Sequence, residues 1–106
     1  MTESAIQQKI AKKLRAAGYL VTTMPAPSGW PDIRAFGLSR TILIEVKRSG
    51  KEPSELQYVM MKKFIDLGYE CYVMDNTLDI DNVIQMSMGD VLRMNEKQSI
   101  DPDVWV

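Results

Sequence analysis

The segment 41–47 is the part of the sequence that most constrains the fold. Its residues alternate between two faces of an extended strand: Thr41, Leu43, Glu45 and Lys47 on one, and Ile42, Ile44 and Val46 on the other. The segment 32–36 also has an extended pattern, and the four residues 37–40 between the two have the length of a hairpin connection. An antiparallel strand pair is therefore predicted near the middle of the chain.

Helical and extended patterns follow one another in the rest of the chain. Ser4 and Gln7 have capping-box spacing near the start of the first helix, and Gly18 and Gly68 are predicted to end two helices. The predicted elements are a helix over 2–18, strands over 19–23, 32–36 and 41–47, a helix over 53–68, a strand over 69–75, and helical structure from 79 onward that breaks near 87–89. This order predicts an α/β fold, α-β-β-β-α-β followed by a helical region, with a mixed sheet flanked by helices.

Apolar periodicity predicts which face of each long helix packs on the sheet. The predicted core positions are Ile6, Ile10, Leu14 and Ala17 in the first helix, and Leu56, Val59, Met60, Phe64 and Leu67 in the second. Glu3 falls within roughly 20° of the first stripe, so it either faces the interior or complements the helix dipole from solvent.

The 106 residues, 45% of them hydrophobic, suffice for one core, so residues 1–106 are predicted to form a single domain with a radius of gyration of about 13 Å. No apolar run approaches the roughly 20 residues of a membrane span, and the first residues do not resemble a signal peptide. A cytoplasmic protein without a membrane partner is expected. Cys71 is the only cysteine, which excludes an internal disulfide.

The chain contains no histidine. This absence excludes Ser-His-Asp and Cys-His nucleophilic sites, His-ligated zinc and any nuclease with a histidine base. Chemistry in this chain must therefore use carboxylates, lysine, hydroxyl groups and hard metal ions.

The net charge of -1 hides an uneven distribution. Residues 1–63 hold eleven Lys and Arg against five Asp and Glu, whereas residues 64–106 hold two against nine. One part of the sequence can thus face phosphates while the other stays acidic. The alternative is a segregation of charge between solvated faces.

The hairpin register predicts a carboxylate pair. If residues 37–40 close the hairpin symmetrically, Asp32 lies directly opposite Glu45, with side-chain roots about 5 Å apart. Like charges opposite each other destabilise a hairpin unless something positive lies between them, and Lys47 lies on the same face. Mg²⁺ or Mn²⁺ would suit this oxygen-rich site. The alternative is an ordinary ion pair on a surface strand.

The segments Gly29-Trp30-Pro31-Asp32-Ile33 and Ile42-Leu43-Ile44-Glu45-Val46-Lys47, joined by a short hairpin, resemble the signature of the PD-(D/E)XK nuclease superfamily. Within it the chain is most similar to the VRR-NUC family, the virus-type replication-repair nuclease domain. The resemblance covers Glu3 to about Asp75, which gives a nuclease core over about 2–75 and a C-terminal helical region and tail over 76–106.

The resemblance implies a role for each matching residue. Asp32 and Glu45 would be the principal carboxylate ligands of Mg²⁺ or Mn²⁺, with Glu3 and the backbone carbonyl of Val46 as further ligands. Lys47 would position or activate the attacking water. Gln57 matches a polar residue aimed at the site, although a capping box with Ser54 also explains it. The expected phosphate contacts are Lys9, Lys12, Lys13, Arg15, Arg34, Arg48 and Lys51.

The resemblance further implies a stand-alone, phage-encoded or bacterial enzyme that acts as a homodimer on branched DNA. The expected function is metal-dependent, structure-selective endonuclease activity, with Holliday junctions as the expected substrate and flaps as another. The apolar end Val104-Trp105-Val106 would fray or dock on a partner subunit. A sequence-specific, restriction-like nuclease and a catalytically inactive DNA-binding module are the alternatives.

Overall fold

The computed structural model describes residues 1–86 and 89–94. Its elements are α1 (Glu3–Ala16), β1 (Leu20–Thr22), β2 (Ile33–Phe36), β3 (Thr41–Val46), α2 (Glu55–Asp66), β4 (Glu70–Met74) and α3 (Asp79–Gln85), and residues 89–94 are also helical. The predicted order of elements and the α/β class are confirmed. The predicted break near 87–89 lies partly outside the described residues, and the tail from 95 lies wholly outside them.

The four strands form one mixed sheet in the order β1-β2-β3-β4. The first two pairings are antiparallel, and β3 pairs parallel to β4 through the crossover helix α2. In the hairpin, Phe36 pairs with Thr41 and Ile33 pairs with Ile44. This is the register expected from symmetric closure of residues 37–40.

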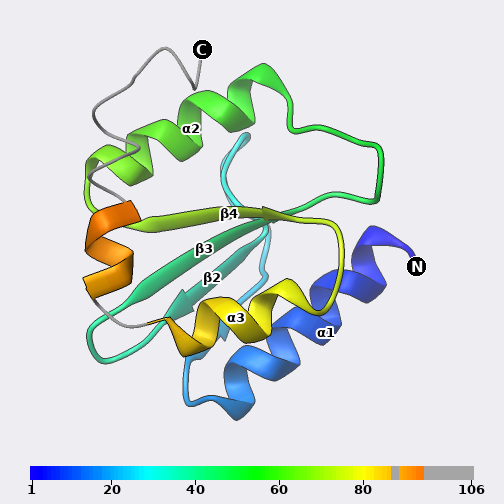
Figure 1. Ribbon diagram of the computed structural model, residues 1–106. Coiled ribbons are helices and arrows are strands. Elements are labelled where there is room, and N and C mark those ends of the chain that lie inside the picture. Colours follow the sequence, from blue (N-terminus) through cyan, green and yellow to red (C-terminus); the bar gives the residue numbers. More distant parts are fainter. Residues whose placement is uncertain (87–88, 95–106) are drawn as a thin grey trace.

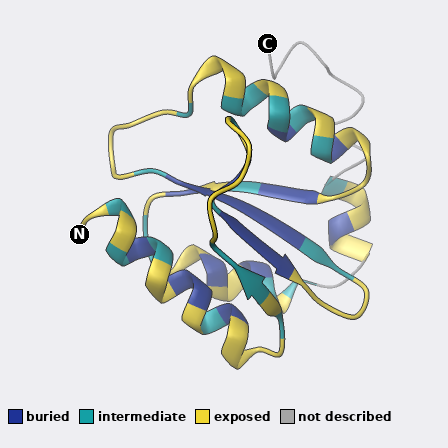
Figure 2. Cartoon of the chain, turned by 180° about the vertical axis from the view of Figure 1, so that it is seen from behind, coloured by how far each residue is buried: buried dark blue, intermediate teal, exposed yellow. Residues whose placement is uncertain are grey.

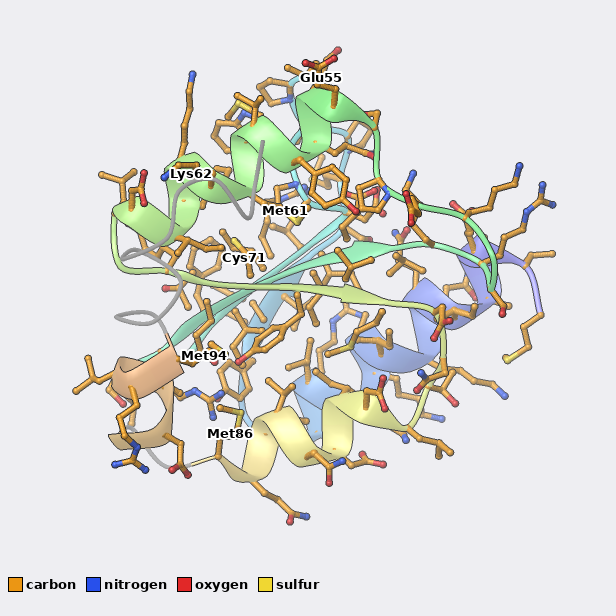
Figure 3. All side chains as sticks on the ribbon, turned by 45° about the horizontal axis from the view of Figure 1, so that its top comes forward. Glu55, Met61, Lys62, Cys71, Met86 and Met94 are labelled. Carbon is orange, nitrogen blue, oxygen red and sulfur yellow. The ribbon has the colours of Figure 1, made fainter. Side chains whose placement is uncertain are left out.

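Helices cover both faces of the sheet, with α2 on one face and α1 and α3 on the other (Figure 1). The alternation of β3 divides the core accordingly, because successive side chains point to opposite faces. Ile42, Ile44 and Val46 pack in the larger cluster, toward α1 and α3. Leu43 joins a smaller cluster with Met61, Ile65 and Cys71, and Figure 3 shows Met61 and Cys71 between α2 and the sheet.

The predicted packing face of α2 is correct only at Phe64, which packs on the smaller cluster. Met61 and Ile65 are its buried residues, whereas Leu56, Val59 and Leu67 are 49%, 41% and 73% exposed. The helix carries two apolar stripes, and periodicity cannot tell which one meets the sheet. Part of the second stripe instead contacts the loop before β2, since the backbone of Gly29 lies against Leu56 and Met60.

Two details of α1 also differ from expectation. Thr2, and not Ser4, caps the helix, because the Thr2 hydroxyl accepts a hydrogen bond from the amide of Ala5. Ala17 is exposed because the helix ends at Ala16, while Ile6, Ile10 and Leu14 are buried as predicted.

No helix in the described ranges 1–86 and 89–94 has the length and apolar character needed to cross a membrane.

Candidate active site

The hairpin register brings Asp32 to the end of β2, next to Glu45 on β3. Regular pairing of the two strands starts at Ile33, one residue after Asp32. At this point the Asp32 side chain replaces the missing strand partner, since its Oδ2 accepts a hydrogen bond of 3.0 Å from the amide of Val46. The side chain is thereby held against the C-terminal end of β3.

Glu45 is a buried carboxylate with one unpartnered oxygen. The residue is 2% exposed, and within the described residues its Oε2 is the only buried side-chain N or O atom without a hydrogen-bond partner. Burial and the neighbouring negative charge of Asp32 raise the pKa of Glu45 to about 8, against the lowering effect of Lys47. The site therefore lacks a positive charge or a donor at this oxygen.

Two side chains approach the other oxygen of Glu45. Gln57 Nε2, from the first turn of α2, donates a hydrogen bond of 2.8 Å to Glu45 Oε1. Lys47 Nζ lies 3.7 Å from the same oxygen, which is ion-pair distance but long for a hydrogen bond. Asp32, Glu45, Lys47 and Gln57, all predicted as site residues, are thus brought together by β2, β3 and α2.

Gln57 combines two roles that the sequence suggested as alternatives. Its Oε1 accepts a hydrogen bond from the amide of Ser54, and its own amide donates to the Ser54 hydroxyl, which completes the capping box of α2. Because the cap uses Oε1, the Nε2 group is left to point at Glu45. The helix cap thus fixes the orientation of a side chain that contacts the site.

Glu3 lies near the same end of β3 but does not complete a three-acid group. Its Oε2 accepts a hydrogen bond of 3.3 Å from the amide of Arg48, the residue that follows Lys47. The side chain is half-buried, so it does not extend freely into solvent. Within the described part of the chain, no group of three or more Asp, Glu, His or Cys residues is arranged to hold a metal ion.

The basic residues predicted to contact phosphates divide into two groups. Lys13 Nζ lies 2.9 Å from Asp81 and donates to the carbonyl of Thr77, and Arg34 is buried with its guanidinium on two backbone carbonyls. The structure gives these two side chains partners inside the chain, which the sequence did not indicate. The others, Lys9, Lys12, Arg15, Arg48 and Lys51, are exposed, although Arg15 also donates a long hydrogen bond of 3.4 Å to the carbonyl of Val21.

The loop that delivers Asp32 is anchored at two points that the sequence did not indicate. Arg34 donates to the carbonyls of Met24 and Pro31, near the two ends of the loop. The Trp30 ring packs edge-on against Phe64 of α2, with ring centroids 5.0 Å apart. Gly29, in the same loop, has a φ of 85°, and an added Cβ would lie 2.7 Å from the Leu56 side chain. The loop therefore needs glycine at this position.

These residues fit a hard divalent cation. A cation beside Glu45 Oε2 would give that buried oxygen its missing partner and would reduce the repulsion between Glu45 and Asp32. Mg²⁺ keeps several waters and commonly binds through one or two carboxylates and substrate phosphates, so two acids are a sufficient protein contribution.

Comparison with known proteins relates this fold to a solved domain. No family model and no curated protein matches the chain. A solved structure described as a "VRR_NUC domain" aligns with a TM-score of 0.69 and 22% sequence identity, over 78% of this chain and 94% of that chain. The chain therefore has a fold similar to that of a VRR_NUC domain, as the sequence motifs predicted.

Proposed function

We propose that this chain is a metal-dependent DNA endonuclease that hydrolyses phosphodiester bonds in branched DNA, with Holliday junctions as the expected substrate. The observation that carries the proposal is the unpartnered, buried Oε2 of Glu45 beside Asp32. The similarity of the fold to a VRR_NUC domain supports the same reading.

The proposed ligands of Mg²⁺ or Mn²⁺ are the carboxylates of Asp32 and Glu45 and the carbonyl of Val46. Glu3, which holds the amide of Arg48, supports this end of β3 from the outer side. When bound, the cation would polarise the phosphate and make a water more acidic.

The chain's own groups orient the reaction. Gln57 holds Glu45 through Oε1, which leaves Oε2 without a hydrogen-bond partner and available to a cation. Lys47, on the same face as Glu45, would position the attacking water and stabilise negative charge that develops on the phosphate. In the proposed hydrolysis the water oxygen bonds to phosphorus and the bond to the 3′ oxygen breaks. The water loses a proton and the 3′ oxygen gains one, which leaves a 5′-phosphate and a 3′-hydroxyl.

Lys9, Lys12, Arg15, Arg48 and Lys51 are proposed to contact DNA phosphates. The radius of gyration is 13.1 Å and the principal extents are 33 × 29 × 23 Å, too small for one copy to cut a four-way junction at two positions. A two-fold dimer would supply two sites related by symmetry. Sedimentation of the protein with and without a junction tests this, and a monomer on the junction would contradict it.

Cleavage assays with labelled four-way, flap and linear DNA in Mg²⁺, Mn²⁺ or EDTA test the proposed activity. We expect the branched DNAs to be cut with either metal and none to be cut in EDTA. The variants Asp32→Ala and Lys47→Ala should lose on the order of 10³-fold in rate, with an unchanged circular dichroism spectrum. Glu52→Gln, an exposed acid between β3 and α2, is the matched control.

Other outcomes would point to the alternatives. A fixed cut sequence on linear duplex would indicate a restriction-like nuclease. Binding without cleavage of any DNA would indicate an inactive DNA-binding module. A wild-type rate for Asp32→Ala would remove the basis of the proposed site.

A further inference from the structure

A cavity of about 300 Å³ lies beside Asp32, where β1 ends and β2 begins. The loop between these strands forms most of its wall, and Gln7 of α1 also lines it. Figure 2 shows this loop as a largely exposed segment that crosses in front of the sheet. Asp32 lines the cavity and also belongs to the proposed metal site, so the cavity adjoins that site.

The wall of the cavity is held in place without a ligand. Arg34, only 9% exposed, donates to the carbonyls of Met24 and Pro31, so one side chain ties together two parts of the loop. Trp30 is fixed by its contact with Phe64. A ligand that enters therefore does not have to order the loop, which lowers the entropic cost of binding.

Two polar side chains in the cavity are available to a ligand. Gln7 and Thr23 are half-buried, and neither side chain has a hydrogen-bond partner among the residues that the structure describes. The Gln7 amide offers both donors and an acceptor, and the Thr23 hydroxyl offers one donor and acceptor positions. Most of the exposed lining is polar, and Met24, Pro25, Ala26, Trp30 and Pro31 add smaller apolar surfaces.

The charges that line the cavity and the volume of the cavity favour a small, neutral ligand. One carboxylate and one guanidinium line the cavity, and the guanidinium already serves two carbonyls. Without an excess of positive charge, the cavity is poorly suited to a second phosphate. Its volume is at the lower end for ligand pockets, too small for duplex DNA. A nucleobase is planar and neutral, with donors and acceptors on its edge, and it packs well on apolar and aromatic walls.

We propose that this cavity binds the base of an unpaired nucleotide next to the phosphate that is cut. This inference rests on the proposed nuclease function. It states which DNA the site selects, namely DNA in which a base next to the cleaved phosphate can leave the base stack. Extrusion of a base costs least where it is already unpaired. Flaps supply such nucleotides, and base pairs at a branch point open more easily than pairs inside continuous duplex.

Binding measurements test the cavity separately from cleavage. Three duplexes are compared by fluorescence anisotropy in EDTA and again in Ca²⁺: one with a single unpaired 2-aminopurine, one with an abasic residue at that position, and one fully paired. We expect the first to bind about five- to tenfold more tightly than the other two, with a change in 2-aminopurine fluorescence. Equal affinity for the base-containing and abasic duplexes, or no DNA binding in either condition, would overturn the proposal.

Variants locate the effect in the cavity. Gln7→Ala should remove about fivefold of the preference for the unpaired base, while Gln8→Ala, its exposed neighbour on α1, should keep it. Thr23→Val, which keeps the side-chain shape, should act in the same direction. A preference that survives both cavity variants would overturn the assignment. A base preference without any cleavage would contradict the nuclease function alone, and cleavage without a base preference would contradict the cavity alone.

Discussion

Glu45 on β3 and Glu70 on β4 are both 2% exposed, but their surroundings differ in every contact. Glu70 uses both oxygens in a two-point pair with Arg40, at 2.7 and 2.8 Å, and also accepts a hydrogen bond from the Tyr72 hydroxyl. Glu45 has one hydrogen-bonded oxygen and one without a partner. A buried carboxylate with all its partners stabilises the fold, whereas one that lacks a partner is suited to bind a ligand from outside.

Arg40 and Glu70 form a buried ion pair in which the polar groups have hydrogen-bond partners. The hydrogen bond to Glu70 raises the pKa of Arg40, so the guanidinium stays charged. The same guanidinium donates to the carbonyls of Val83, Ile84 and Met86, at the end of α3. One ion pair thus joins the hairpin, β4 and α3, on the sheet face opposite α2.

The largest effect is expected for Glu45→Gln, which removes the charge and keeps the shape. We expect cleavage to fall by on the order of 10³-fold, because the proposed cation loses a carboxylate ligand. Folding should remain intact, since Gln at this position can still accept from Gln57. Single-turnover rates and thermal unfolding measure the two effects, with Glu52→Gln as the control. Activity near that of the control would contradict the role of Glu45.

The second test should lower stability and leave the cleavage rate nearly unchanged, the opposite of Glu45→Gln. Glu70→Gln leaves the charge of Arg40 buried and without its partner, so the free energy of unfolding should fall by about 3–5 kcal/mol. The rate per folded molecule should stay close to that of the parent protein, because this ion pair is distant from the proposed chemistry. Urea unfolding and single-turnover cleavage at low temperature measure these values. Unchanged stability would show that the ion pair is dispensable.

The third test uses pH and metal-free protein. The pKa of Glu45 is raised from 4.5 to about 8 in the folded state, so between these values the folded chain holds a proton that the unfolded chain releases. The free energy of unfolding contributed by this group therefore falls as pH rises from about 5 to about 8, on the order of a few kcal/mol. Glu45→Gln should remove this dependence. An identical pH profile for parent and variant in EDTA would contradict the raised pKa.

The smallest effect is expected for Ser54→Ala. Loss of the cap should cost about 1 kcal/mol of stability. Because the hydroxyl cap holds the first turn of α2, which carries Gln57, the cleavage rate should also fall several-fold, although Ser54→Ala keeps the backbone amide that donates to Gln57 Oε1. Ser54→Asp, which can restore the cap, should recover both quantities. Recovery of stability without recovery of rate would show that the cap and the site are independent.

The sequence predicted which side chains face the core more accurately for strand β3 than for helix α2. Alternation in β3 is a period-two pattern, and both faces of the strand were assigned as the structure has them. In α2 two apolar stripes compete, and the buried residues Met61 and Ile65 lie outside the predicted face, of which Phe64 packs against them. For Lys13 and Arg34, both predicted phosphate contacts, charge alone does not reveal the intramolecular partners that the structure shows, Asp81 and a loop carbonyl.

The sequence by itself determined the element order, the hairpin register and hence the approach of Asp32 to Glu45, because a four-residue connection fixes the pairing of its flanking strands locally. Only the tertiary structure decided that the Gln57 amide meets Glu45, that Arg40 meets Glu70, and that a cavity opens beside Asp32. These contacts join separate elements, and their geometry depends on how helices and loops pack across the sheet, which no local pattern specifies.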